Sequence, residues 1–141
     1  MKQWVLVVDD DVNMTNLVSM RLESAGFSVT TAHDAKQAYI QAEALRPILV
    51  VSDMQMPGFG SGADAVKAMR ECPFLRATPI IILTGMDLRE AAGLLPKDPF
   101  VRLMGKPLNW PLMSQTIQDL LKIAPGAAPA APAPAPTQPP K

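Results

Sequence analysis

The sequence of 141 residues predicts an α/β domain, and three observations support this fold class. Five short apolar segments alternate with five segments of helical periodicity. Several apolar segments have no polar position, as expected of strands that are covered on both faces of a parallel sheet. Polar and charged side chains gather where these segments end. Because crossover connections are right-handed, we expect a doubly wound five-stranded parallel sheet with five helices.

The first two strands and the helix between them are predicted within the first 32 residues. Trp4–Val8 is a continuous apolar run, typical of a buried strand. Residues 11–24 carry apolar side chains spaced by three and four, which predicts a helix. Gly26 stands where a helix C-terminal cap belongs, and residues 27–32 alternate as the second strand.

The second helix and the third strand follow. Residues 34–45 are predicted to be helical, and Asp34 with Gln37 resembles a capping box at the helix start. The β-branched run Ile48–Val51 predicts a buried strand that ends at Asp53.

The next segments of the chain predict two further helices around a fourth strand. A Gly-rich loop at residues 55–62 leads into a helix at residues 63–71. Ile80–Leu83 predicts a buried strand that ends at Thr84, and residues 87–95 predict one short helix.

The fifth strand and the last helix complete the predicted domain. Residues 100–104 form the strand with the weakest pattern. Asn109 can cap the last helix, with Pro111 in the first turn, where a missing N–H group does no harm.

An Ala/Pro-rich segment follows the predicted domain. Residues 124–141 have no apolar periodicity, so burial cannot offset the entropy lost on ordering them. We therefore expect a domain at residues 1–123 and a flexible tail or linker at residues 124–141. The sequence leaves open whether the chain is a single-domain protein or a fragment whose linker leads to another domain.

Composition and charge argue against several classes of function. The 13 basic residues balance the 13 acidic residues, and no basic patch is visible, so nucleic acid is a poor candidate partner. No apolar run reaches the roughly 18–20 residues that a membrane span needs. The single cysteine, Cys72, cannot form an internal disulfide, which suits a reducing compartment. The start of the sequence has no signal-peptide architecture, so we expect a cytoplasmic protein.

Chemistry-bearing side chains follow four of the five predicted strands. Asp9 and Asp10 follow the first strand, Asp53 ends the third, Thr84 ends the fourth, and Lys106 follows the fifth. In a parallel sheet these strand ends lie at one edge, where ligands bind in such folds. The sequence therefore predicts one shallow site that combines carboxylates, a hydroxyl group and an ammonium group.

These residue types suit phosphoryl transfer. A hard divalent cation relieves the repulsion between neighbouring carboxylates, and Mg²⁺ binds one or two carboxylates together with phosphate oxygens. A carboxylate can act as a nucleophile and form an acyl phosphate. An ammonium group and a hydroxyl group can stabilise the charge of the transferring group.

Several residues have plainer interpretations. Asp11 fits the role of a helix cap, and Lys106 taken alone would be an ordinary surface lysine. His33 is expected at the surface or in a cap, Cys72 in inert packing, and Trp110 as an anchor for the start of the last helix. Only the joint pattern at four strand ends favours a functional site.

Four motifs resemble the receiver domain of two-component response regulators. Val7–Asp11 resembles the acidic signature of its first strand, and Ser52–Gly58 the segment around its phosphoacceptor aspartate. Ile81–Gly85 resembles its fourth strand with the switch hydroxyl, and Gly105–Leu108 its Lys-Pro segment. The resemblance covers about residues 3–123 and implies a CheY-like, flavodoxin-like fold with strand order 2-1-3-4-5.

The resemblance also implies a role for each site residue. Asp53 would be the phosphoacceptor. Asp9, Asp10 and Asp53, with the backbone carbonyl of Gln55, would hold Mg²⁺ or Mn²⁺, Asp10 directly and Asp9 through water. Thr84 would hydrogen-bond the phosphoryl group.

Further expectations concern the lysine and the partners. Lys106 would pair with the phosphoryl group, and the Lys106–Pro107 peptide is often cis in this family. The donor would be a phosphohistidine on a sensor histidine kinase or a phosphotransfer protein. The domain would catalyse only its own phosphorylation and dephosphorylation, bind an unidentified downstream protein, and be a monomer or a weak phosphorylation-dependent dimer.

The sequence departs from the family pattern mildly at Gly85, where alanine is common, and more clearly in three other places. Leu103 stands where receivers usually carry a switch aromatic. The loop at residues 58–62 is about one residue longer than usual. Residues 94–99 contain two prolines, which predicts a short or irregular fourth helix.

Two other hypotheses remain. A pseudo-receiver that is never phosphorylated would serve only as an interaction scaffold, and Leu103 favours it. A metal-dependent phosphatase with an aspartyl nucleophile commonly needs a second acid two residues later, and here that position is Gln55.

Overall fold

The computed structural model describes residues 3–54, 58 and 62–123, and it confirms the predicted fold class. All five strands are parallel, in the order β2-β1-β3-β4-β5. In chain order the elements are β1 (Trp4–Val8), α1 (Val12–Ser24), β2 (Ser28–Ala32), α2 (Ala35–Leu45), β3 (Leu49–Asp53), α3 (Gly62–Glu71), β4 (Ile80–Thr84), α4 (Leu88–Leu94), β5 (Val101–Gly105) and α5 (Trp110–Ile123).

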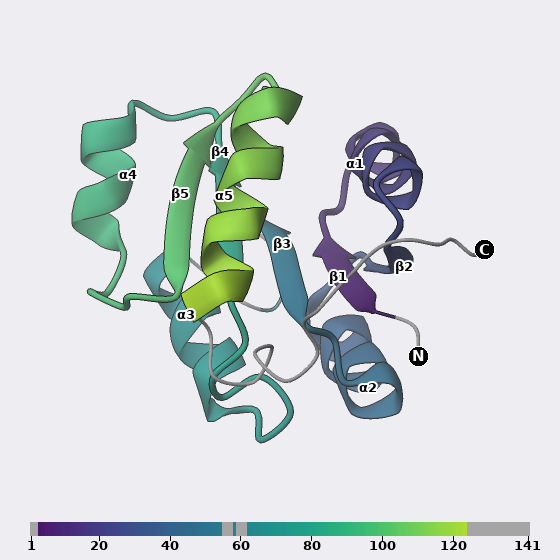
Figure 1. Ribbon diagram of the computed structural model, residues 1–141. Coiled ribbons are helices and arrows are strands. Elements are labelled where there is room, and N and C mark those ends of the chain that lie inside the picture. The colour runs from purple at the N-terminus through teal and green to yellow at the C-terminus, as the bar shows by residue number, and fades with distance from the viewer. Residues whose placement is uncertain (1–2, 55–57, 59–61, 124–141) are drawn as a thin grey trace.

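Two apolar clusters cover the two faces of the sheet. Figure 1 shows the helices placed on both sides of the sheet. On one face, inward side chains of the strands pack against α1 and α5, as Leu22 and Ile117 illustrate. On the other face they pack against α2, α3 and α4, as Ala42, Met69 and Ala91 illustrate. Successive side chains of a strand point to opposite faces, so unbroken apolar runs such as β4 supply both clusters. The doubly wound arrangement follows from this pattern.

Side-chain caps start the helices at the expected places. Asp11 caps α1 by accepting hydrogen bonds from the backbone N–H groups of Asn13 and Met14. Asp34 caps α2 by accepting from Gln37 N at 2.8 Å. The predicted capping box is incomplete, because the Gln37 amide oxygen accepts from His33 N, one residue before the cap.

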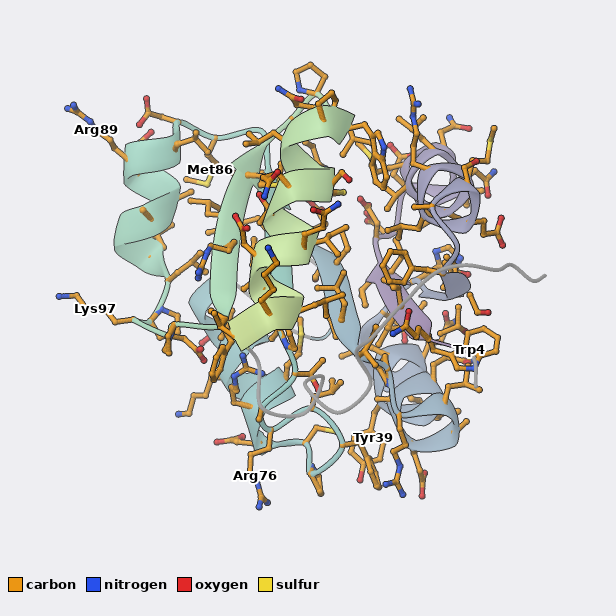
Figure 2. The ribbon with its side chains drawn as sticks, viewed as in Figure 1. Trp4, Tyr39, Arg76, Met86, Arg89 and Lys97 are labelled. Carbon is orange, nitrogen blue, oxygen red and sulfur yellow. The ribbon has the colours of Figure 1, made fainter. Side chains whose placement is uncertain are left out.

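Element boundaries differ only slightly from the predictions, including those of α4. The two prolines of residues 94–99 accompany a helix of only seven residues, as predicted, with Asp87 as N-cap and Leu95 as C-cap. Figure 2 shows Arg89 and Lys97 pointing away from the sheet at the two ends of this helix. Leu103 on β5 is half-buried against the apolar cluster that includes Ala91.

Some predictions fall outside the described residues: those for Gln55, for most of the loop at residues 58–62 and for the segment 124–141. Cys72 is buried and unpaired, as expected. Within residues 3–54, 58 and 62–123, no helix has the length and apolar character needed to span a membrane.

Candidate functional site

The register of the sheet brings the predicted site residues to one edge. Val8 lies opposite Ser52, so Asp9 and Asp53 follow at the same level. Thr84 lies opposite Gly105, which places Lys106 just beyond the end of β5. The chain at this corner is fixed further because Lys106 N donates to the Thr84 carbonyl at 2.7 Å. The Lys106–Pro107 peptide is cis, as expected.

Three carboxylates meet at this edge. One oxygen each of Asp9, Asp10 and Asp53 lies within 4.8 Å of the other two. Asp9 is buried, Asp53 is half-buried and Asp10 is exposed, so the cluster opens from the core to solvent. Asp9 Oδ2 is buried and accepts no hydrogen bond from the residues that the structure describes. A buried carboxylate oxygen without a donor, beside two further carboxylates, fits a hard divalent cation such as Mg²⁺.

The electrostatics of Asp9 reflect this crowding. Burial is the largest influence and raises the pKa of its carboxyl group. The backbone N–H of Asp11, which donates to Asp9 Oδ1 at 2.9 Å, and the charge of Lys106 act in the opposite direction. The charges of Asp53 and Asp10 raise the pKa further, and the net shift is upward. The site therefore favours additional positive charge.

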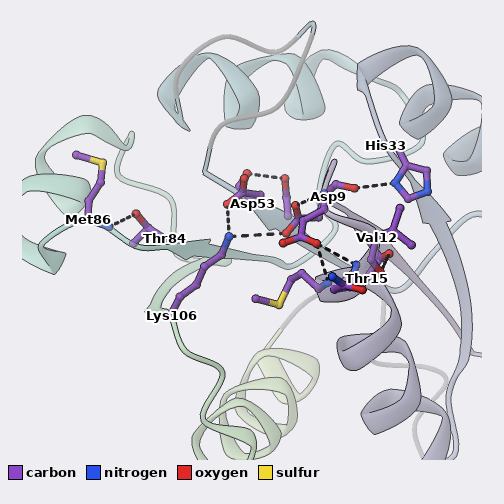
Figure 3. A network of polar contacts seen from close by, with 12 residues as sticks. Asp9, Val12, Thr15, His33, Asp53, Thr84, Met86 and Lys106 are labelled. Carbon is purple, nitrogen blue, oxygen red and sulfur yellow. Dashed lines mark hydrogen bonds and ion pairs between the residues drawn. The ribbon is translucent and has the colours of Figure 1, made fainter.

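Lys106 supplies part of that charge (Figure 3). Its Nζ donates to Asp53 Oδ1 at 2.9 Å and lies 3.8 Å from Asp9 Oδ2, an ion-pair distance too long for a hydrogen bond. Burial alone would lower the pKa of Lys106, but the bond and charge of Asp53 and the charge of Asp9 outweigh burial and raise it. The ammonium group is therefore charged at neutral pH.

Thr84 is buried at the end of β4, and its hydroxyl group is engaged locally. Its Oγ accepts a hydrogen bond from the backbone N–H of Met86 at 2.9 Å. The structure thus places Thr84 at the predicted edge, with its hydroxyl turned to the chain that leads into α4.

His33 was not predicted at the site, yet its ring contacts the acidic loop. Nδ1 of His33 lies 2.8 Å from the backbone carbonyl oxygen of Asp9 (Figure 3). A usable signal exists in the sequence, because His33 directly follows a strand predicted to lie in the same sheet as Trp4–Val8. Residue type alone did not distinguish this position from an ordinary surface histidine.

Comparisons with known proteins agree with the fold and with the motifs. The family model described as the response regulator receiver domain matches residues 5–118. The probable transcriptional regulatory protein TcrX of Mycobacterium tuberculosis is 41% identical over 93 residues, which cover 64% of this chain and 38% of TcrX. The alkaline phosphatase synthesis regulator PhoP of Bacillus subtilis is 31% identical over 132 residues, covering 92% of this chain and 52% of PhoP.

A solved structure extends the comparison. The chemotaxis protein CheY4 of Vibrio cholerae superposes with a TM-score of 0.71 and 30% identity, covering 85% of this chain and 99% of CheY4. The chain spans about half or less of the length of the two curated relatives. With its parallel sheet in the order 2-1-3-4-5 and its strand-end motifs, the chain belongs to the family of two-component response regulator receiver domains.

Proposed function

We propose that the chain takes a phosphoryl group on Asp53 from a phosphohistidine of a sensor histidine kinase or a phosphotransfer protein. The observation that carries this proposal is the half-buried Asp53 carboxylate, which is bonded to Lys106 at 2.9 Å and lies beside Asp9 and Asp10. A nucleophile, a fixed cation and a pair of metal ligands are the components that phosphoryl transfer to a carboxylate requires.

The proposed reaction uses the side chains in defined roles. A carboxylate oxygen of Asp53 attacks the phosphorus atom, and the bond between phosphorus and the donor imidazole nitrogen breaks. The imidazole leaves with the electron pair, and Asp53 becomes an acyl phosphate. Lys106 then pairs with a phosphoryl oxygen, and the Thr84 hydroxyl turns from Met86 N to donate to another oxygen. Attack of a water molecule on the phosphorus atom breaks its bond to the Asp53 oxygen, which releases inorganic phosphate and restores the carboxylate.

A divalent cation fits the same group of residues. Asp9, Asp10 and Asp53 would hold Mg²⁺ or Mn²⁺, and the backbone carbonyl of Gln55 is proposed as a further ligand from outside the described residues. When bound, the cation neutralises charge on the phosphoryl oxygens and on the carboxylates. Asp9 Oδ2 supports the assignment, because it is buried and accepts no hydrogen bond within the described part of the chain.

The proposed output is a change in protein binding. Residues 1–123 are the receiver domain in this proposal, and residues 124–141 are a flexible tail or linker. The downstream partner is a protein, and dimerisation, where it occurs, is weak and depends on phosphorylation. The domain has no substrate other than its own phosphoryl donor.

One observation favours a second candidate, an interaction scaffold that is never phosphorylated. Leu103 stands where a switch aromatic is expected, and it packs half-buried against an apolar cluster. A leucine in this place has no ring to move between an inward and an outward position. The intact set of Asp9, Asp10, Asp53, Thr84 and Lys106 favours the phosphorylatable receiver over the scaffold.

Direct phosphorylation distinguishes the two candidates. We expect incubation with acetyl phosphate and Mg²⁺ to add the mass of one phosphoryl group, and expect no gain for Asp53→Asn or after chelation of the metal. Asp119→Asn is a matched control, because Asp119 is an exposed carboxylate on α5 that is bonded to Gln115. A wild-type protein that is folded, binds Mg²⁺ and gains no mass would support the scaffold instead.

A further inference from the structure

The β2–α2 turn carries a histidine whose ring contacts the backbone of the acidic loop. We propose that His33 is a positioning residue, which holds the peptide between Asp9 and Asp10 in the orientation that divalent-metal binding requires. The inference deepens the proposed function and rests on it, because it concerns the same carboxylates. His33 touches no reacting atom in this proposal.

Asp9 is held by two consecutive residues of the neighbouring chain segment. Its backbone N–H donates to the Ala32 carbonyl at 3.1 Å, which continues the β1–β2 pairing beyond Val8. Its carbonyl oxygen accepts from His33 Nδ1 at 2.8 Å. Both hydrogen-bonding groups of the Asp9 backbone are therefore tied to the end of β2, so this part of the loop has little freedom to rotate.

The carbonyl contact reaches the metal ligands through the geometry of the peptide group. The Asp9 carbonyl and the Asp10 N–H belong to one planar unit, so fixing the oxygen also fixes the Asp10 Cα. Asp10 is exposed and lies outside the strand, so the rest of its surroundings constrain it weakly. A rigid peptide places the Asp10 carboxylate beside that of Asp9 before a cation arrives, which lowers the cost of ordering on binding.

His33 is itself well anchored. Its backbone N–H donates to Gln37 Oε1 at 2.8 Å, and the following residue, Asp34, caps α2. Ala32, on its other side, is fully buried at the end of β2. Because the backbone of this turn is fixed by these bonds, the His33 ring can hold the acidic loop in place. This arrangement distinguishes His33 from a surface histidine with a chance contact.

The contact also determines which nitrogen of the neutral ring carries the proton. A carbonyl oxygen only accepts hydrogen bonds, so Nδ1 must be the donor. His33 is the single histidine of the sequence, so its ring nitrogens can be assigned without ambiguity in ¹⁵N NMR spectra. In the neutral ring, we expect the Nδ1–H tautomer to predominate. A predominant Nε2–H tautomer would overturn the proposal in the wild-type protein, without any variant.

A pair of substitutions tests the effect on the site. Asn and Leu have the same branching at Cγ, but only Asn carries an N–H donor at the position of Nδ1. We expect His33→Leu to weaken Mn²⁺ binding about three- to tenfold, the range expected for the loss of a hydrogen bond that orients a ligand. We expect His33→Asn to stay within about twofold of wild type, since it retains the donor.

The measurement is direct Mn²⁺ binding, followed by the loss of the free-ion electron paramagnetic resonance signal, together with thermal unfolding in the absence of metal. Gln41→Leu is the matched control, because it removes a bond between α2 and β2, from Thr30 Oγ to Gln41 Oε1, without touching Asp9. We expect this control to bind Mn²⁺ as wild type does.

The outcomes separate the inference from the proposed function. Equal loss of Mn²⁺ affinity in His33→Leu and His33→Asn, or unchanged affinity in folded His33→Leu, would overturn the role of His33. In either case, Mn²⁺ binding by wild type would still support the proposed metal site. Wild type that binds no Mn²⁺ would overturn both. Should His33→Leu fail to fold, the tautomer and the affinity of His33→Asn still decide.

Discussion

The ammonium nitrogen of Lys106 lies 2.9 Å from Oδ1 of Asp53, so the proposed nucleophile is paired with a cation before any phosphoryl group arrives. The same nitrogen lies 3.8 Å from Oδ2 of Asp9. The positive charge of Lys106 therefore lies close to the carboxylates that would bind a divalent cation. Its charge opposes metal binding in the resting protein and stabilises the phosphoryl group after transfer, so the two effects should separate on substitution.

Replacing Lys106 with Met should move two measurements in opposite directions. Mn²⁺ affinity should increase about three- to tenfold, because a competing positive charge is removed while the stem of the side chain is retained. The rate of phosphorylation by acetyl phosphate should fall about 100-fold or more, as for loss of a group that stabilises developing charge. Lys122→Met, in the last turn of α5, should change neither quantity. Weaker metal binding in Lys106→Met would contradict this account of the ion pair.

Asp9→Asn should stabilise the metal-free protein at neutral pH. Burial raises the pKa of Asp9, so the folded state binds its proton more tightly than the unfolded chain does. Below the unfolded pKa of about 3.9 the carboxyl group is protonated in both states and does not lower the stability of the fold. As pH rises from there through the pKa of the folded state, the carboxyl group lowers that stability progressively. A neutral amide avoids that cost, which we expect to be worth about 0.5–2 kcal/mol.

Thermal unfolding over a range of pH checks this prediction. The stability advantage of Asp9→Asn should shrink toward about pH 4 and below, where the wild-type carboxyl is also protonated. Mg²⁺ should stabilise wild type and have little effect on the variant, because the variant has lost one carboxylate of the cluster. An advantage independent of pH would point to packing rather than charge.

Thr84 should change its hydrogen-bond partner on phosphorylation. In the resting structure its Oγ accepts from Met86 N at 2.9 Å. Binding of a beryllium fluoride mimic should therefore shift the amide resonance of Met86 in wild type, and that shift should disappear in Thr84→Val. The substitution should cost about 1 kcal/mol of stability, the usual net value of one hydrogen bond. Thr116→Val, on α5, should respond to the mimic as wild type does.

Much of the fold could be predicted because parallel strands covered on both faces leave a plain pattern. Val50 and Ile81 are fully buried, and each belongs to an unbroken apolar run. The first residue of a strand was harder to predict, because an apolar residue just before the strand can donate its backbone N–H to an acceptor outside the sheet. Phe27 N donates to the Leu22 carbonyl at the end of α1, and Phe100 N donates to Asp98 Oδ1. The hydrophobicity of the sequence indicates neither of these two hydrogen bonds.

The location of the candidate site could be predicted because parallel strands present their carboxyl ends at one edge. Asp53 and Lys106 are 53 positions apart in the chain, yet each lies at or directly after the end of a strand, so both could be predicted at this edge. The contact of His33 could not be predicted, since it depends on the register between β1 and β2 and on a backbone carbonyl. Backbone acceptors carry no signature in the sequence, so a residue that binds one resembles any polar surface residue.

A second ion pair, remote from the carboxylate cluster, should determine stability at low pH. Arg70 Nε donates to Asp98 Oδ2 at 2.8 Å, and its Nη1 donates to the carbonyl oxygens of Leu75 and Thr78. One arginine on α3 thus connects the segment before β4 with the segment before β5. Removing it takes the Arg70 donors from three acceptors, of which the Leu75 carbonyl still accepts from Thr78 N, so we expect Arg70→Leu to cost about 2–3 kcal/mol.

The pH dependence of this pair has the opposite sign to that of Asp9. Burial alone would raise the pKa of Asp98, but the bonds from Arg70 and from the Phe100 N–H, together with the charge of Arg70, lower it overall. The resulting stability is present above the unfolded pKa of about 3.9 and is lost as pH falls through the lower folded value. Wild type should therefore exceed Asp98→Asn in free energy of unfolding by a constant amount above about pH 5, and the difference should narrow below about pH 4.

Urea unfolding of wild type, Arg70→Leu and Asp98→Asn across this range tests the assignment. Arg102→Leu is the matched control, because Arg102 also donates to backbone carbonyls, those of Pro99 and Val101, and belongs to β5, close in sequence to Asp98. We expect this half-buried arginine to contribute less than about 1 kcal/mol. Asp98→Asn should lose less stability than Arg70→Leu, since the two carbonyl bonds of Arg70 survive. A difference between wild type and Asp98→Asn that stays constant down to about pH 3 would show that the Asp98 carboxyl is not stabilised by charge.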